Sequence, residues 1–234
     1  MSDLQPDTST AESHAVSLLL LTFIAGMLDG LSYLRENVFT ANMTGNMVLL
    51  GIHLTQRDFP DAGRSLVALA AFAIGCIIAG FLILEREDRG RSVMTIGFSA
   101  ELFLLIIFAV LFLMGRAGTG YLVHGALIFT AAMALAVQSV VVRRLRISGV
   151  VTTFLTGTIT TSMLGVVRVL RKQRAPEEKA EEQHIALLIA MLLLYFAAVV
   201  FATFLSTSAP LLVAILPSII LVAVIWRFSR SFGR

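Results

Sequence analysis

Two polar stretches that resemble each other decide how this chain is organised. The first, VFTANMTGN, runs from Val38 to Asn46, and the second, VVTTFLTGT, runs from Val150 to Thr158. They align without gaps, share four identical residues in nine, and lie 112 residues apart in a chain of 234. Each follows a segment rich in small residues and an Arg-containing turn. This shared position predicts an internal duplication, of the kind from which transporter folds are commonly built.

The chain around these stretches is strongly apolar. Hydrophobic residues make up 57% and charged residues 14%, whereas an ordinary soluble domain carries about 25% charged residues. This composition excludes a water-soluble enzyme, a disordered protein and a secreted disulfide scaffold. Cys76 is the single cysteine, so no disulfide can form within the chain. We therefore expect an all-α polytopic membrane protein.

A bilayer requires about 20 apolar residues for each spanning helix, and eight segments are candidates. They are Ala15–Leu34, Val38–Leu54, Ser65–Leu84, Val93–Met114, Tyr121–Val142, Gly149–Val167, Ile185–Leu205 and Pro210–Trp226. The second and sixth contain the two polar stretches and differ from the other six. The predicted organisation is a polar tail (1–14), one membrane domain (15–227) with repeats 15–114 and 119–227, and a basic tail (228–234). The first tail lacks Lys and Arg, so we expect no cleaved signal peptide.

The distribution of Lys and Arg tests the number of spans. If all eight segments cross the membrane, the 18 cations divide 11 to 7 between its two sides. If the second and sixth segments enter and leave on the same side, they divide 14 to 4. The second arrangement obeys the positive-inside rule better. It predicts six spanning helices, two broken or re-entrant segments, cytoplasmic termini and halves of opposite orientation, an inverted 3+3 repeat. The acidic flank before the first helix and Arg35 after it locally favour the opposite orientation.

Several short motifs in this order resemble a known family. They are AGMLDG at Ala25–Gly30, MTGN at Met43–Asn46, Gln138 followed by RRL at Arg143–Leu145, and TFLTGT at Thr153–Thr158. Together they resemble the YoaK-like family of bacterial membrane proteins, over nearly the whole chain. The resemblance implies about six transmembrane helices, the bacterial cytoplasmic membrane and no established activity. A more distant relation to the major facilitator superfamily would imply parallel halves or a half-transporter that dimerises, which the charge count does not favour.

Ionisable residues inside predicted spans are candidates for function, because an unpaired charge there is costly. Asp29 is interpreted either as a protonatable or cation-binding carboxylate, or as a partner of Arg35 and cap of a broken helix. Glu101 falls near the middle of the fourth segment and is expected to face the bundle. A proton relay through Asp29, Glu101 and His124 is one hypothesis, and burial among satisfied neighbours is the other. Gln138 is the neutral counterpart of Asp29 in the second half.

The two Thr-Gly motifs offer a second kind of site. Gly permits a break in a helix, and Thr and Asn can bond freed backbone groups or a ligand. The candidate binding residues are Asn42, Thr44, Gly45, Asn46, Thr156, Gly157 and Thr158. In an inverted duplication, Gly45 and Gly157 are expected to meet near the midplane, with Asp29 bordering the same space. The alternative is tight helix packing through small residues, which also accounts for Gly75, Ala79 and Gly80.

The chain lacks the sequence signatures of common hydrolases, metalloproteases and phosphate-binding loops. We therefore expect no enzyme activity, no cofactor, no metal and no nucleic-acid partner. The predicted function is a secondary transporter or permease for a small solute, with the lipid bilayer around it and a homodimer left open by the modest size of the bundle. The alternative is a membrane protein that transports nothing and organises other subunits or lipids.

Overall fold

The computed structural model describes residues 8–84, 90–115, 120–144, 155–170 and 178–231. These residues form eight α-helices, and none of them lies in a β-strand. The helices are α1 (Thr8–Glu36), α2 (Met43–Gln56), α3 (Phe59–Leu84), α4 (Gly90–Met114), α5 (Tyr121–Arg143), α6 (Leu155–Leu170), α7 (Glu178–Ser208) and α8 (Pro210–Ser231). The all-α prediction is confirmed.

Six of these helices, α1, α3, α4, α5, α7 and α8, are long and apolar enough to cross a bilayer. The prediction of six spanning helices is therefore confirmed. With 14 and 16 residues, α2 and α6 measure about 21 and 24 Å at 1.5 Å per residue, short of the hydrocarbon core of about 30 Å. Apolar side chains such as Ile77, Phe81, Phe196 and Phe204 are exposed on the spanning helices, where lipid would solvate them.

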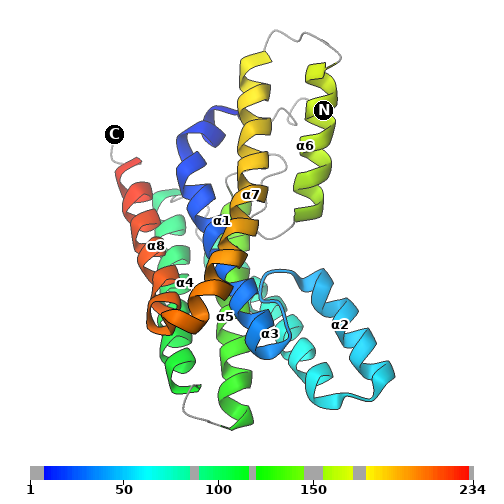
Figure 1. The fold of residues 1–234 in the computed structure, drawn as a ribbon. Coiled ribbons are helices and arrows are strands. Elements are labelled where there is room, and N and C mark those ends of the chain that lie inside the picture. Colours follow the sequence, from blue (N-terminus) through cyan, green and yellow to red (C-terminus); the bar gives the residue numbers. More distant parts are fainter. Residues whose placement is uncertain (1–7, 85–89, 116–119, 145–154, 171–177, 232–234) are drawn as a thin grey trace.

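The two short helices enter the bundle from opposite ends. In Figure 1, α1 runs from the top of the bundle to the bottom. The chain then goes back up to mid-depth, where α2 begins and descends to the bottom, and α3 rises to the top. In the second half, α5 rises to the top, α6 rises from mid-depth to the top, and α7 descends. Each short helix is thus re-entrant. The first turn of α1 and the last turn of α8 lie at the same end (Figure 1), as the positive-inside count predicted.

Close helix contacts depend on small residues. A Cβ atom at Gly26 would lie 2.6 Å from the carbonyl oxygen of Tyr195, so α1 approaches α7 backbone to backbone. In the same way, a Cβ at Gly75 of α3 would lie 2.7 Å from the Cβ of Ala136 on α5. Close approach of this kind drives helix association in lipid. The packing interpretation of Gly75 agrees with these contacts, whereas a Cβ at Gly80 would meet nothing within 4 Å.

Corresponding helices of the two halves make corresponding contacts. Helix α1 packs along α7, and α5 packs along α3. The short helices follow the same order, because α2 lies on α3 and α6 lies on α7. An inverted duplication would produce this pattern, and the duplication itself stays a prediction. The central core forms mainly between α1, α4, α5, α7 and α8.

Candidate functional site

Asp29 holds the turn that carries the chain from α1 to α2. Its carboxyl group is 2% exposed, in a helix that spans the membrane. Its Oδ1 accepts hydrogen bonds from the backbone N–H groups of Thr40 at 2.7 Å and Ala41 at 2.6 Å, and from the Thr40 hydroxyl at 3.3 Å. The hydroxyl of Tyr195, on α7, donates to Oδ2. The carboxyl group thus satisfies backbone donors that an irregular segment leaves free inside a bilayer.

Asn46 completes the same turn from the other side. It is fully buried, its Oδ1 accepts from the N–H of Phe39 at 2.8 Å, and its Nδ2 donates to the carbonyl of Phe39 at 2.6 Å. The side chain therefore pairs with both polar backbone groups of one residue, as a neighbouring strand would. Asn42 caps α2, because its Oδ1 accepts from the N–H of Gly45 at 3.2 Å. These bonds explain why the motif needs two Asn residues at this spacing.

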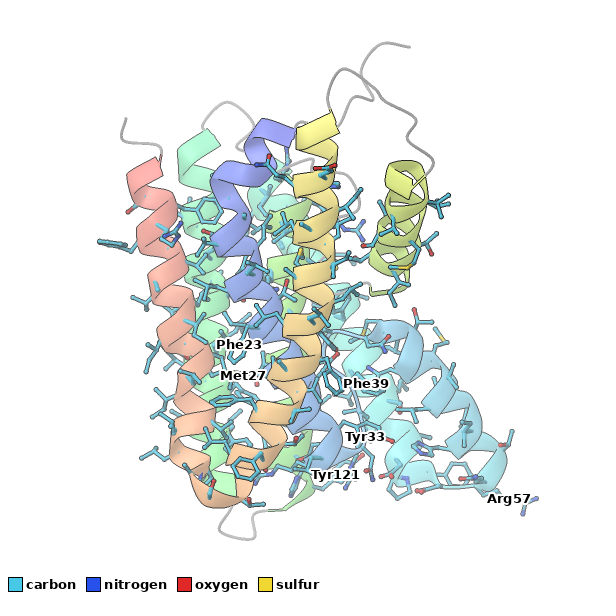
Figure 2. All side chains as sticks on the ribbon, turned by 45° about the horizontal axis from the view of Figure 1, so that its top comes forward. Phe23, Met27, Tyr33, Phe39, Arg57 and Tyr121 are labelled. Carbon is cyan, nitrogen blue, oxygen red and sulfur yellow. The ribbon has the colours of Figure 1, made fainter. Side chains whose placement is uncertain are left out.

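Gly45 has a steric reason to be glycine. A Cβ atom there would lie 2.9 Å from the ring of Phe39 and 3.1 Å from Nδ2 of Asn42. The Phe39 ring is itself stacked on Tyr33, with centroids 4.8 Å apart (Figure 2), which restricts its movement. Thr44, in contrast, is exposed in the first turn of α2. In the first motif, therefore, Thr44 has an exposed side chain that is available to a ligand or lipid.

The second motif has different surroundings. Helix α6 begins at Leu155, and the side chain of Thr156 lies outside the described residues. A Cβ at Gly157 would meet nothing within 4 Å, and Thr158 is 3% exposed. The Thr158 carbonyl accepts from the hydroxyl of Ser162 at 2.7 Å. The glycine of this motif is therefore not required by local packing among the described residues.

The first turns of the two short helices face each other. In both figures the lower end of α6 lies directly above the upper end of α2, at mid-depth in the bundle. The N-terminal ends of both helices thus point into the same region from opposite sides. That Gly45 and Gly157 themselves meet there, with Asp29 beside them, stays a prediction. Because the N-terminal end of a helix carries a partial positive charge, the region favours negative or electronegative groups.

Two other predicted residues lie away from this turn. Gln138 of α5 is fully buried, and its Nε2 donates to the carbonyl of Leu21 at 3.2 Å. Glu101 of α4 is also fully buried, and neither of its carboxyl oxygens has a hydrogen-bond partner among the described residues. The structure therefore does not join Glu101 to the turn that Asp29 holds.

A third polar cluster lies at the opposite end of the bundle from the termini. Nδ1 of His124 lies 2.7 Å from Oε1 of Glu36, which is 2% exposed. Arg35 lies 3.7 Å from the same oxygen and donates to the carbonyl of Phe112 at 3.1 Å. Arg35 therefore bonds to Glu36 and Phe112. The alternative interpretation, in which Asp29 pairs with Arg35, does not match these contacts. Asp29, Glu101 and His124 have separate surroundings, so they form no direct relay.

Three residues that matter in these contacts were absent from the sequence prediction. Tyr195 lies 166 residues from Asp29 in the sequence. The one hint of its role was that a tyrosine hydroxyl stands in the middle of an apolar segment. Phe39 contributes its backbone, which no pattern of side chains reveals. Glu36 directly follows Arg35, and the pair could have been noticed as a charged helix end. The described residues contain no group of three His, Cys, Asp or Glu side chains placed to hold a metal ion.

Comparison with known proteins places the chain among membrane proteins. A family model described as "Protein of unknown function (DUF1275)" matches residues 17–226. The chain is also 35% identical, over 153 residues, to a protein from Bacillus subtilis (strain 168) described as "UPF0700 transmembrane protein YoaK". That match covers 64% of this chain and 66% of the relative, so it spans slightly less than two thirds of the relative's length. No solved structure matches.

Proposed function

The chain belongs to the DUF1275 family, a family of unknown function, and we propose that it is a secondary transporter or permease for a small solute. The observation that carries this proposal is the meeting of two re-entrant helices, α2 and α6, whose N-terminal ends face each other at mid-depth (Figures 1 and 2). Transporters bind their substrates near the midplane between half-helices of this kind. The chain spans the membrane of the cell, as its transmembrane relative does.

The chemistry of this region suggests what the solute would offer. The positive ends of two helix dipoles favour a solute with an electronegative group. Thr44 supplies an exposed hydroxyl in the first turn of α2. Asp29 and Asn46 hold the turn and would place this hydroxyl without touching the solute themselves. Support for the proposal therefore comes from the opposed helix ends and not from the buried carboxylate.

A second candidate is a membrane protein that organises other subunits or lipids and transports nothing. One observation favours it: the polar groups of Asp29 and Asn46 are bonded within the protein, as a sealed packing interface would require. The two candidates differ in what happens at the first turns of α2 and α6. A transporter must expose this region to water at some stage, whereas a scaffold keeps it closed.

An uptake assay with purified protein in proteoliposomes tests the proposal. The probes are labelled amino acids, carboxylic acids, sugars and nucleobases, each with and without a pH gradient. We expect wild-type protein to accumulate at least one of them, and Thr44→Val to slow its uptake about fivefold, the value of one hydrogen bond of about 1 kcal/mol. Thr55→Val is the matched control, because Thr55 is exposed near the other end of α2. Failure to transport any solute class would favour the scaffold.

A further inference from the structure

We propose that Glu101 is a proton-binding site inside the helix bundle and carries a proton in the conformation described. Glu101 lies in α4, a spanning helix, and its side chain has no exposed surface. Neither Oε1 nor Oε2 has a hydrogen-bond partner in the part of the chain that the structure describes. The inference rests on the proposed function in one respect: if the protein is a transporter, this proton would be the ion that couples transport.

The packing around α4 explains why Glu101 is enclosed. One turn before it, a Cβ at Gly97 would overlap the side chain of Val141 on α5, so the two helices touch there. Because α4 and α5 run in opposite directions (Figure 1), the level of Glu101 corresponds to that of Val137 and Gln138 on α5. Both of these residues are buried. Helix α5 therefore packs against α4 at the level of Glu101 with buried residues.

Helix α8 encloses the same region from another direction. Phe98, three residues before Glu101, packs against Phe228 with ring centroids 5.4 Å apart. Phe228 is also stacked on His14 of α1, at 4.8 Å between centroids. Phe98 is fully buried and Phe228 is 3% exposed, so two aromatic rings close this side. Water does not reach the carboxyl group in this conformation.

Charge energetics then decide the protonation state. An ionised carboxylate taken out of water, with neither a cation nor a donor beside it, costs several kcal/mol in real proteins. Protonation removes the charge and leaves the smaller cost of a buried neutral group. An ionisable residue in a spanning helix is tolerated when it faces the bundle and serves a purpose there. Glu101 satisfies the first condition, and binding and releasing a proton would satisfy the second.

Other titratable groups lie on the helices that pack against α4. The described ones on the helices packed against α4 are Asp61, Arg64, Cys76, Tyr121, His124, Arg143 and Arg227. His124 is bound to Glu36 and Arg64 to Asp61, and Arg227 is exposed. None of the listed groups bonds to Glu101. The proton is therefore the species that neutralises Glu101 in this conformation.

Infrared spectroscopy of reconstituted protein tests the inference without a transport assay. A protonated carboxyl group gives a carbonyl stretching band that an ionised carboxylate lacks. We expect wild-type protein at neutral pH to show this band, with the isotope shift that ¹³C-labelled glutamate produces. Glu101→Gln should lose the band, and Glu36→Gln should keep it, because Glu36 lies against His124 and Arg35. Absence of the labelled band from wild-type protein, or its survival in Glu101→Gln, would overturn the inference.

A second measurement uses the pH dependence of unfolding. A carboxyl group that is protonated when folded and ionised when unfolded makes the folded state less stable as pH rises. We expect the melting temperature of wild-type protein to fall relative to Glu101→Gln between mildly acidic and mildly alkaline pH. Parallel curves for the two proteins would contradict the proton site. A failure of the uptake assay leaves both readouts in place, so the proposed function and this inference fail separately.

Discussion

Asp29 and Glu101 are both buried acids in spanning helices, and their surroundings are opposite. Asp29 accepts four hydrogen bonds, from two backbone N–H groups and two hydroxyls. Glu101 accepts none from the described residues. The donors around Asp29 favour an ionised carboxylate and hold an irregular turn through it, whereas the surroundings of Glu101 favour a neutral acid. Burial of an ionisable group in a membrane protein therefore does not by itself identify its role, because its hydrogen-bond donors decide it.

The largest expected effect lies on the Asp29 side of this comparison. Asp29→Ala removes the acceptor for the N–H groups of Thr40 and Ala41 and for the hydroxyl of Tyr195. Each buried donor left without a partner costs about 1–3 kcal/mol, so we expect a loss of about 3–5 kcal/mol in the free energy of unfolding. Denaturant titration in detergent micelles measures it. A loss below about 1 kcal/mol would break the comparison, because Asp29 would then not hold the turn.

Asn46 provides the next largest test of the same turn. Asn46→Ala leaves both polar backbone groups of Phe39 unpaired, which we expect to cost about 2–3 kcal/mol. Gln56→Ala is the matched control, because Gln56 is an exposed amide at the other end of α2. The control should change stability by less than about 0.5 kcal/mol. Equal losses in the two variants, in the same titration, would contradict a special role for Asn46.

Tyr195 tests whether Asp29 is charged. Tyr195→Phe removes one donor to the carboxylate and leaves three, so we expect a loss of about 1.5–3 kcal/mol if Asp29 is ionised. The ring remains, so the substitution removes the hydroxyl alone. A loss well under 1 kcal/mol in thermal or denaturant unfolding would indicate that Asp29 is neutral, and the contrast with Glu101 would disappear.

The smallest effect is expected at Glu101 itself. Glu101→Gln keeps the shape of the side chain and replaces a neutral acid with a neutral amide, so at neutral pH the free energy of unfolding should change by less than about 1 kcal/mol. Glu101→Met, which adds no polar atom, should be neutral or stabilising for the same reason. Severe destabilisation by both substitutions would mean that the charge of Glu101 is used in the folded state.

Most of the polar residues that form the turn between α1 and α2 could be recognised in the sequence, because the pattern that marks them lies within a few neighbouring residues. Asp29, Asn42, Gly45 and Asn46 were recognised because polar residues and glycines interrupt an apolar segment, and a break in a spanning helix must satisfy its own backbone. The choice between a binding role and a capping role for Asp29 stayed open, because both require the same residue. The second motif is less defined, since residues 145–154 and the side chain of Thr156 lie outside the described residues.

The number of spans follows from the sequence alone, and so does the expectation for their directions. Insertion into a bilayer depends on sums over about 20 neighbouring residues and on the cations in short loops, and both are properties of the linear chain. Only the tertiary structure decided which acid is paired and which is not. Tyr195 reaches Asp29 across 166 residues of sequence, and Glu101 is enclosed by helices that follow it in the chain. Such contacts depend on how the helices pack, and in lipid packing is governed by close fit between surfaces and not by hydrophobicity.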